Sequence, residues 1–283
     1  MTISTFTKTI VAGAVLAVGA RFAGAEEFNV FNPHPEKNRT ADGKWTLHDE
    51  SRPQPPRAAP DEQMERKLAQ MPADATVLLG KTGDLAAWHD TRIWHTEDGV
   101  VVSRYRAPRD LMSKEPFGSC RLHLEWAAPA QSDRKGQDRA NSGVIFMGRY
   151  EIQVLDTYEN KTYADGMAGA VYGVRPPDFN SLRPSGEWQS YDIWFKRPTF
   201  DADGKMATPA YVTVFVNGVL VQNNIPFEGR SSHRNRDGYQ RHNDKEPLVL
   251  QYHNEIVSYR NVWLVPIDDG APVETPAGKL GGQ

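Results

Sequence analysis

Short runs that alternate between apolar and polar residues, or are apolar throughout, recur between residues 76 and 266 and constrain the fold most. An extended segment with this pattern has one apolar face, which is typical of a strand in a half-buried sheet. No long heptad pattern accompanies them, so an all-β fold is predicted. The predicted strands are Thr76–Leu79, Val100–Arg104, Arg121–Trp126, Gly143–Phe146, Tyr150–Leu155, Trp188–Lys196, Tyr211–Val216, Val219–Gln222, Leu248–His253 and Tyr259–Pro266.

The turns between these runs support the same conclusion. In "YVTVFVNGVLVQ" the pair Asn217-Gly218 predicts a two-residue type I′ hairpin, because both central positions of that turn need positive φ. The stretch "FDADGK" at 200–205 predicts a longer turn; it also resembles part of a calcium loop, but the distal Glu of such a loop is missing. Many short strands with few helices predict a β-sandwich, in which two sheets pack face to face.

The first 25 residues differ in composition from the rest of the chain. Lys8 precedes an apolar run at 10–20, and the small residues 23–25 stand before Glu26, which is the pattern of a secretory signal peptide. We expect cleavage after Ala25 and a periplasmic or secreted mature protein. The alternative is an uncleaved N-terminal anchor. No later segment is apolar enough to span a bilayer.

Two further segments flank the predicted sandwich. Residues 26–72 are rich in Pro, Asn and charge, which predicts an extended leader that lies over the domain rather than a second core. Trp45 is its expected anchor, and Asp61–Gln70 is a candidate for one short helix. We expect the sandwich to run from 73 to 268 and residues 269–283 to form a flexible tail.

The charge balance excludes some classes of ligand. The net charge is −3 and acidic and basic residues are well mixed, so the chain lacks the basic surface typical of nucleic-acid-binding proteins and any polybasic membrane patch. This favours a neutral or mildly polar small molecule. Cys120 is the single cysteine, so no intramolecular disulfide forms and stability must come from the core.

Two of the predicted strands place polar side chains on one face. In "RLHLEW" His123 and Glu125 lie opposite to the Leu and Trp side chains, and in "YEIQVLD" Glu151 and Gln153 lie opposite to Ile and Val. If the two strands are neighbours in one sheet, all four groups line a single surface. The alternative is an ordinary solvated sheet face, which antiparallel sheets commonly have.

Asp156 is out of step with this alternation, which would place it on the apolar side. Either the strand ends at Leu155, or a bulge turns the carboxylate to the polar face, as bulges do beside active sites. The spacing of Glu151 and Asp156 also resembles the acidic strand of laminarinase-type glucanases. Gln153 stands where that family has a carboxylate, which argues against a retaining two-carboxylate mechanism.

A second group of polar residues lies in "LVLQYHNEIVSYRNVW". His253 follows an apolar strand, and a His in this place can serve as a general base or a metal ligand. Arg260 opens the next strand; its alternative role is a buried ion pair that holds the sandwich together. The remaining His residues lack paired metal-binding spacings. The basic loop 230–241 is expected to be solvated rather than closed over a substrate.

Several stretches together resemble the 3-keto-disaccharide hydrolase domain family, also described as 3-keto-glucoside 1,2-lyases and 3-keto-2-hydroxy-glucal hydratases. The resemblance runs roughly from Val77 to Pro266 and includes, in order, "LLGKTGDLAAWH", "SKEPFGSCRLHLEW", "NSGVIFMGRYEIQVLDTY", "YADGMAGAVYG" and "LVLQYHNEIVSYRNVW". It implies a concanavalin A-like jelly-roll sandwich and an enzyme that acts on 3-keto sugars.

The resemblance also implies the residues of a site. Carried over residue by residue, the site falls on Glu151, Gln153, Asp156 and His253, with Asn141, Arg149 and Arg260 in support. The polar strand face adds His123 and Glu125, and Trp188 is available for stacking on a sugar. The sequence departs from the family pattern at Tyr252, where Asp is frequent, and at Met147, where Arg is frequent.

Such a site suits a 3-keto sugar, because oxidation at carbon 3 makes the proton on carbon 2 acidic. We expect His253 to remove that proton and Arg260 or a bound divalent metal ion to stabilise the enolate. Glu151 or Asp156 would protonate the group that leaves carbon 1. Water then adds to the resulting glucal, so the net reaction is hydrolysis.

Two alternatives use the same fold. A non-catalytic carbohydrate-binding module needs a stacking platform, for which Trp188, Tyr172 and Tyr158 are available. A conventional glucanase-like glycoside hydrolase would cleave unoxidised sugar.

Overall fold

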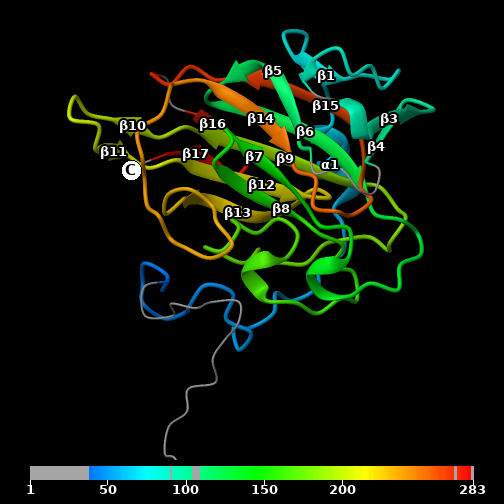
Figure 1. The fold of residues 1–283 in the computed structure, drawn as a ribbon, viewed down its shortest axis with the longest axis horizontal. Helices are drawn as coiled ribbons and strands as arrows, with labels where there is room; N and C mark the ends of the chain where they lie inside the picture. Colours follow the sequence, from blue (N-terminus) through cyan, green and yellow to red (C-terminus); the bar gives the residue numbers. More distant parts are fainter. Residues whose placement is uncertain (1–37, 90, 104–108, 271–272, 282–283) are drawn as a thin grey trace, which may run out of the picture. The chain divides into compact units, whose positions relative to one another are not determined.

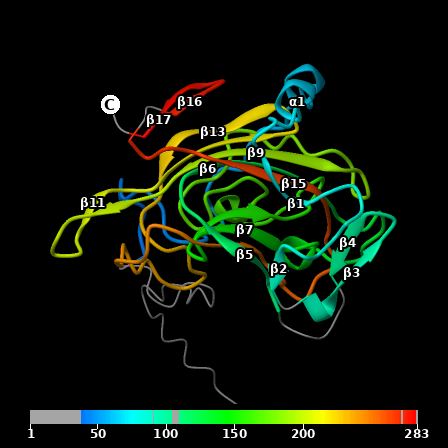
Figure 2. The ribbon, with the colours of Figure 1, turned by 90° about the horizontal axis from the view of Figure 1, so that it is seen from above.

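Two β-sheets pack face to face in the computed structural model (Figures 1 and 2). The structure describes residues 38–89, 91–103, 109–270 and 273–281, and the predicted signal peptide lies outside these ranges. Within each sheet the neighbouring strands run antiparallel. The predicted all-β sandwich is therefore confirmed.

The larger sheet has eight strands in the order β13-β12-β9-β6-β15-β4-β3, and β1 pairs with β15 beside this path. Its strands are β1 (Thr76–Leu79), β3 (Trp94–Glu97), β4 (Val100–Ser103), β6 (Cys120–Ala127), β9 (Gln189–Lys196), β12 (Tyr211–Val216), β13 (Val219–Pro226) and β15 (Ser258–Pro266).

The smaller sheet has five strands in the order β2-β5-β14-β7-β8. Its strands are β2 (Trp88–His89), β5 (Leu111–Phe117), β14 (Glu246–Leu250), β7 (Ser142–Phe146) and β8 (Tyr150–Val154). The remaining elements are helix α1 (Glu62–Leu68), the short helices η1 (Thr91–Ile93), η2 (Gly136–Asp138) and η3 (Ala164–Gly166), and the hairpins β10 (Thr199–Phe200) with β11 (Met206–Thr208) and β16 (Val273–Thr275) with β17 (Gly278–Leu280).

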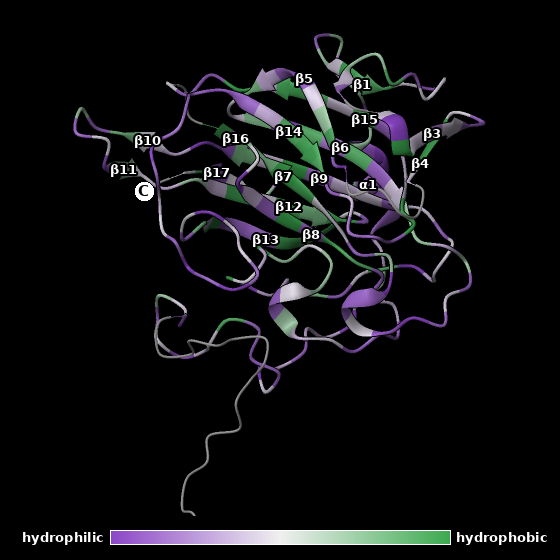
Figure 3. Ribbon diagram, viewed as in Figure 1, coloured by the Kyte–Doolittle hydropathy of each residue, from purple (hydrophilic) through white to green (hydrophobic). Residues whose placement is uncertain are grey.

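The core lies between the two sheets and follows from the alternation of the strands. Leu122, Leu124 and Ile193 of the larger sheet pack in the same cluster as Val144 and Ile152 of the smaller one, and all five are fully buried. Figure 3 shows hydrophobic residues concentrated on the strands and hydrophilic residues on the loops between them. The polar residues of β6 and β8 therefore lie on the outer faces, where a site can form. Part of the outer face of the larger sheet is apolar, because Trp194 and Phe215 pack there against α1 and the β16–β17 hairpin.

All ten predicted strands correspond to observed strands, with ends that differ by up to four residues; the end predicted at Arg104 lies outside the described residues. Several strands were not predicted. β5 was missed because its sequence "LMSKEPF" contains Lys, Glu and Pro, which are depleted in strands. Its Pro116 pairs opposite Pro247 next to an irregularity in the β5–β14 register, where a missing N–H is tolerated. The tail predicted to be flexible contains the β16–β17 hairpin, and Val273 and Leu280 are buried in it.

The turn predicted at Asn217-Gly218 is confirmed. Both residues have positive φ, at 50° and 77°, and they connect Val216 to its partner Val219. A Cβ on Gly218 would come within 2.1 Å of the Asp61 carbonyl oxygen. The turn therefore needs glycine both for its backbone conformation and for the close approach of the leader.

The described part of the leader packs against the sandwich. The predicted helix is observed as α1, and the Asp61 side chain caps it by accepting a hydrogen bond from the Met64 N–H at 3.0 Å. Arg57 forms an isolated bridge with Asn180. The expected anchor Trp45 is half-buried, whereas Leu47 and His48 are 1% exposed. Leu47 and His48, and not Trp45, therefore anchor the leader, because the side chains of these two residues pack against the loop at 163–173.

Candidate active site

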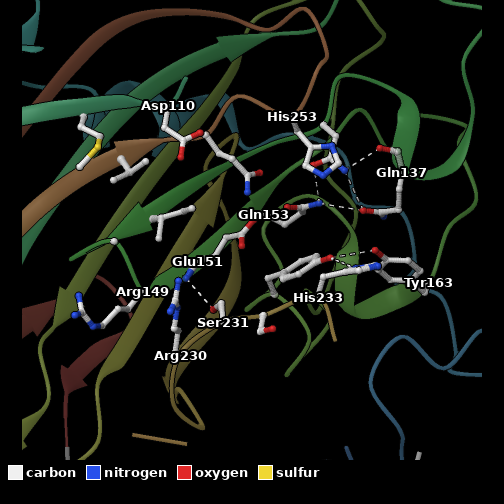
Figure 4. A pocket seen from close by; sticks show the side chains of 18 of the residues that line it. Asp110, Gln137, Arg149, Glu151, Gln153, Tyr163, Arg230, Ser231, His233 and His253 are labelled. Carbon is white, nitrogen blue, oxygen red and sulfur yellow. Dashed lines mark hydrogen bonds between the residues drawn. The ribbon is translucent and has the colours of Figure 1, made fainter. Parts of the chain in front are cut away.

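The outer face of the five-stranded sheet forms the floor of a cavity of about 590 Å³ (Figure 4). Residues of β5, β7, β14 and β8 face into it, and its walls come from residue 110 and from the segments 137–141, 148–149, 163–172, 230–233 and 251–253. Its lining includes Asp110, Met112, Gln137, Asp138, Asn141, Ile145, Arg149, Glu151, Gln153, Tyr163, Tyr172, Arg230, Ser231, Ser232, His233, Val249, Gln251 and His253. The volume is within the range of small-molecule sites.

Glu151 lies on the floor of this cavity, and its place depends on Gly143 of the neighbouring strand. β7 and β8 pair so that Gly143 is opposite Gln153 and Ile145 is opposite Glu151. A Cβ on Gly143 would lie 2.5 Å from Glu151 Oε1, so the missing side chain makes room for the carboxyl group. The Glu151 backbone N–H donates to Ser231 Oγ at 3.0 Å, which fixes the strand to the loop at 230–233.

The carboxyl group of Glu151 is in an environment that disfavours its charge. Glu151 is 7% exposed, and burial together with the nearby carboxylate of Asp110 raises its pKa to about 8. Among the described residues, no Arg or Lys forms an ion pair with it. Glu151 is therefore protonated at neutral pH and can donate a proton.

Gln153 stands beside Glu151, and two further amide side chains, Gln137 and Asn141, adjoin Gln153. One terminal atom of Gln153 lies 3.0 Å from the Ser142 carbonyl oxygen and 3.1 Å from Glu151 Oε1. Because a carbonyl oxygen only accepts, this atom is the amide nitrogen and donates to both. The other end of the Gln153 amide faces the side chain of Gln137 at 3.2 Å, and Asn141 Nδ2 donates to the Gln137 carbonyl at 2.8 Å. This arrangement fixes the orientation of the carboxyl group.

The two ends of the cavity differ in chemistry. Asp110 and Arg149 lie toward one end, and Gln137, Tyr163 and His233 lie toward the other, with Glu151 and Gln153 between them (Figure 4). Arg149 and Arg230 supply positive charge to the cavity. The site therefore offers a proton donor between guanidinium groups and a wall of aromatic and amide groups.

Two imidazole rings line the cavity. His253 follows β14 and is exposed to the cavity. His233 accepts or donates a hydrogen bond at Nδ1, 3.1 Å from Tyr172 Oη, and burial together with the nearby His48 lowers its pKa. His233 is thus neutral at pH 7, as a general base must be.

Five of the predicted site residues meet in this cavity. They are Asn141, Arg149, Glu151, Gln153 and His253. Within β8 the predicted alternation is confirmed, since Glu151 and Gln153 face the cavity while Ile152 and Val154 belong to the core. The roles predicted for the five residues stay predictions.

Asp156 is not part of the cavity lining. Of the two alternatives for this residue, the bulge is not observed, and the strand ends before Asp156 as the other alternative expected. β8 ends at Val154, and its pairing with β7 is regular. The Asp156 carboxylate is 2% exposed and is paired with Arg139, whose Nε lies 3.0 Å from Oδ2. Ser185 also donates to it. Asp156 therefore fixes the loop after β8 and cannot protonate a substrate in the cavity.

The remaining predicted residues lie on the outer face of the other sheet. β6 belongs to the eight-stranded sheet and β8 to the five-stranded one, so the expectation that His123 and Glu125 share a surface with Glu151 is wrong. The alternation of each strand was predicted correctly, but it contains no information about which strands are neighbours. Arg260 and Trp188 lie with His123 and Glu125, around a separate hollow of about 260 Å³.

This second polar surface is held together by paired charges. Arg260 Nε donates to Glu125 Oε2 at 2.6 Å, and the guanidinium lies 3.9 Å from the centre of the Trp188 ring. Burial alone would lower the pKa of His123, but its bonds to Asp192 and Glu125 outweigh that and raise it to about 9. Arg260 thus forms an ion pair, as its alternative role expected, but the pair is not buried, because the Arg260 side chain is 40% exposed on the outer face of the sheet.

Sequence reasoning missed much of the cavity wall. Asp110 lies in an irregular segment and Gln137 in the short helix η2, neither with a distinguishing sequence pattern, and the loop expected to be solvated contributes Arg230, Ser231 and His233. One available signal was the family-like stretch "YADGMAGAVYG", which contains both Tyr163 and Tyr172. A second cavity of about 510 Å³ adjoins the first and shares four of its lining residues: Gln137, Asp138, Tyr163 and His233.

Within the described ranges, no three or more His, Cys, Asp and Glu side chains are grouped so as to hold a metal ion. No helix in the described part of the chain has the length and apolar composition needed to cross a membrane.

The sequence matches the 3-keto-alpha-glucoside-1,2-lyase-like domain family over residues 74–265. This chain belongs to that family. The predicted resemblance and the predicted jelly-roll sandwich are therefore confirmed. No curated protein matches the sequence.

Two solved structures from Parabacteroides distasonis are similar to this chain. A candidate glycosyl hydrolase is 33% identical, with a TM-score of 0.67, and the match covers 79% of this chain and 98% of that one. A second candidate glycosyl hydrolase is 20% identical, with a TM-score of 0.49, covering 74% and 98%. The family and the first of these structures support a carbohydrate-active role.

Proposed function

We propose that the protein cleaves 3-keto-glucosides by β-elimination between carbons 1 and 2 of the oxidised sugar, followed by hydration. The observation that carries this proposal is Glu151, a carboxyl group whose pKa is raised to about 8 in a cavity that also contains two imidazoles and two guanidiniums. Elimination from a 3-keto sugar needs a base, an acid and a positive charge near the enolate oxygen. The cavity contains a candidate for each.

His253 removes the proton from carbon 2, and the electron pair moves to form the enolate of the 3-keto group. Arg149 and Arg230 stabilise that negative charge; they take the role expected of Arg260, which lies on the other sheet. The bond between carbon 1 and its oxygen then breaks, and Glu151 protonates the departing oxygen. Addition of water across the new double bond, with its proton at carbon 2 and its hydroxyl at carbon 1, gives the 3-keto sugar.

The test uses matched oxidised and unoxidised sugars. Purified protein is incubated in deuterium oxide with 3-keto-trehalose, 3-keto-lactose and their parents, with and without a chelator. We expect release of sugar from the oxidised compounds alone, with solvent deuterium at carbon 2 of the product. The His253→Ala variant should turn over more slowly by a factor on the order of 100 to 10,000, because a positioned general base is lost. Product without deuterium would exclude the elimination.

A conventional glycoside hydrolase is the second candidate, and Asp110 favours it. The carboxylate of Asp110 lies in the same cavity as Glu151 and contributes to its raised pKa, so an acid and a carboxylate are both available despite Gln153. The same experiment separates the two functions. Release of sugar from unoxidised trehalose or lactose supports the hydrolase and contradicts our proposal.

A further inference from the structure

A short part of the leader lies directly behind the aromatic end of the active-site cavity. Leu47 and His48 are each 1% exposed, and both precede residue 74, where the family match begins. Gly173 makes room for them, because a Cβ there would come within 2.6 Å of Leu47 Cδ1. The leader is thus fitted into the wall of the site and does not merely cover the sandwich.

His48 is held in this place by a buried carboxylate. The His48 backbone N–H donates to Asp165 Oδ2 at 3.0 Å, and its Nδ1 donates to Asp165 Oδ1 at 3.3 Å. Asp165 is fully buried. The backbone of His48 has a φ of 58°, a left-handed conformation that costs energy for a side chain other than glycine. Two bonds to one carboxylate hold the residue in a strained conformation, which favours a role beyond filling space.

The ring of His48 supports three residues that line the cavity. Its centre lies 4.0 Å from that of Tyr163 and 5.1 Å from those of Tyr172 and His233. The same three side chains are linked to one another, since Tyr163 Oη lies 3.2 Å from Tyr172 Oη, which lies 3.1 Å from His233 Nδ1. His48 is therefore the common support of a hydrogen-bonded row of side chains.

This row separates the active-site cavity from its neighbour. Tyr163 and His233 line both cavities, so a shift of their side chains would change the shape of both. The leader contributes to the second cavity as well, because Glu50 lines it. Two leader residues thus lie next to the same wall: His48 packs behind it, and Glu50 lines the second cavity beside it.

We propose that His48 is a positioning residue for substrate binding. Held by Asp165, its ring fixes the wall of Tyr163, Tyr172 and His233 against which the sugar binds, and the leader is therefore part of the active site. The inference rests on the proposed function in that this wall is taken to contact the 3-keto sugar. His48 lies behind the wall and takes no part in the chemical step.

The His48→Asn variant tests this with little risk of unfolding. Asn tolerates positive φ and can donate its side-chain N–H to Asp165, so the variant removes the ring while it keeps the anchor. We expect KM for 3-keto-trehalose to rise about tenfold and kcat to stay within about threefold of the wild-type value. This pattern is expected when a variant loses an interaction that binds the ground state and the transition state equally well. Trp45→Ala, which removes a ring from the same leader, should change neither constant.

A second measurement does not depend on turnover. The rate at which diethyl pyrocarbonate modifies His233 is read by peptide mass spectrometry in the wild type and both variants. We expect a rise of about threefold or more in His48→Asn alone, because the exposed His233 has its Nδ1 held by Tyr172 in the wild type, and loss of the ring that supports both frees this nitrogen to react. If the wild type cleaves none of the sugars, the proposed function fails and this rate still decides the role of His48. Wild-type values of KM and of the modification rate in His48→Asn would overturn the inference.

Discussion

Glu151 and Glu125 occupy similar places on the outer faces of the two sheets, each on a strand that alternates polar with apolar residues. Glu125 accepts hydrogen bonds from Arg260 and Asn261, at 2.6 and 2.9 Å, and lies 3.9 Å from His123. Burial would raise the pKa of Glu125, but these partners lower it to about 2. Glu151 has an amide and a second carboxylate beside it, and its pKa is raised to about 8.

The difference shows how a carboxylate that stabilises the fold can be distinguished from a carboxyl group that is a candidate for catalysis. The protein stabilises the charge of Glu125 with paired partners, and the group then contributes to the stability of the larger sheet. Glu151 has no cationic partner among the described residues, so its carboxyl group keeps its proton at neutral pH. Burying this group without a partner costs stability. The hollow beside Glu125 is thus explained by its ion pairs, and the cavity beside Glu151 is the better candidate for catalysis.

The largest expected effect is on turnover. Glu151→Gln keeps the shape of the side chain but removes the proton donor, so turnover of a 3-keto-glucoside should fall by a factor on the order of 100 to 10,000. Glu125→Gln should turn over at the wild-type rate within about twofold. Steady-state kinetics on both proteins measures this. Equal losses of turnover in the two variants would contradict the assignment of catalysis to the face that carries Glu151.

The second effect is on the pH dependence of stability. Glu151 has an ordinary pKa of 4.5 and a folded pKa of about 8, so between these values the folded protein binds a proton that the unfolded chain has lost. Its contribution to stability therefore falls as pH rises through this window and is constant above it. The free energy of unfolding of Glu151→Gln relative to wild type should rise from pH 5 to pH 9 by up to about 4 kcal/mol, because about three pH units of the window lie in this range.

Urea denaturation of both proteins at the two pH values measures that difference. Glu125 has the opposite sign, because its folded pKa is lowered to about 2; its contribution is present above pH 4.5 and is lost as pH falls toward 2. A difference between Glu151→Gln and wild type that does not change with pH would contradict the raised pKa.

The third effect is on the stability of the larger sheet. Glu125→Gln weakens the bonds to Arg260 and leaves the buried His123 with one carboxylate partner, Asp192, so we expect a loss of about 1–3 kcal/mol in the free energy of unfolding. Glu97→Gln is the matched control, because the Glu97 side chain is 75% exposed, and its effect should be within about 0.5 kcal/mol. Equal stability of the two variants would show that the ion pairs contribute nothing measurable.

The smallest effect concerns Trp188. Trp188→Ala removes the contact between the ring and the Arg260 guanidinium, which is worth about 1 kcal/mol at a partly exposed site. Sugar affinity, measured by titration calorimetry in a Glu151→Gln background, should change by less than about twofold. A tenfold loss of affinity would mean that the ring is a stacking platform after all and that sugar binds on the larger sheet.

The alternation of apolar and polar residues determined the strands and their faces from the sequence alone. A side-chain period of two is a local property, so the apolar sides of β6 and β8, the hairpin at Asn217-Gly218 and the outward direction of Glu151 and Gln153 could all be predicted. The family motifs added the fold and five residues of the cavity. β5 was missed because its exposed Lys, Glu and Pro hide the strand pattern.

Only the tertiary structure decided which polar faces meet. Sheet membership depends on pairings between strands far apart in the chain, and these separated His123, Glu125, Arg260 and Trp188 from the cavity. The fold also brought Asp110 beside Glu151, and the bonds to Asp165 placed the leader's His48 behind Tyr163. A local pattern fixes the direction of a side chain, whereas burial and charged neighbours, which set its chemistry, come from segments that only the folded chain brings together.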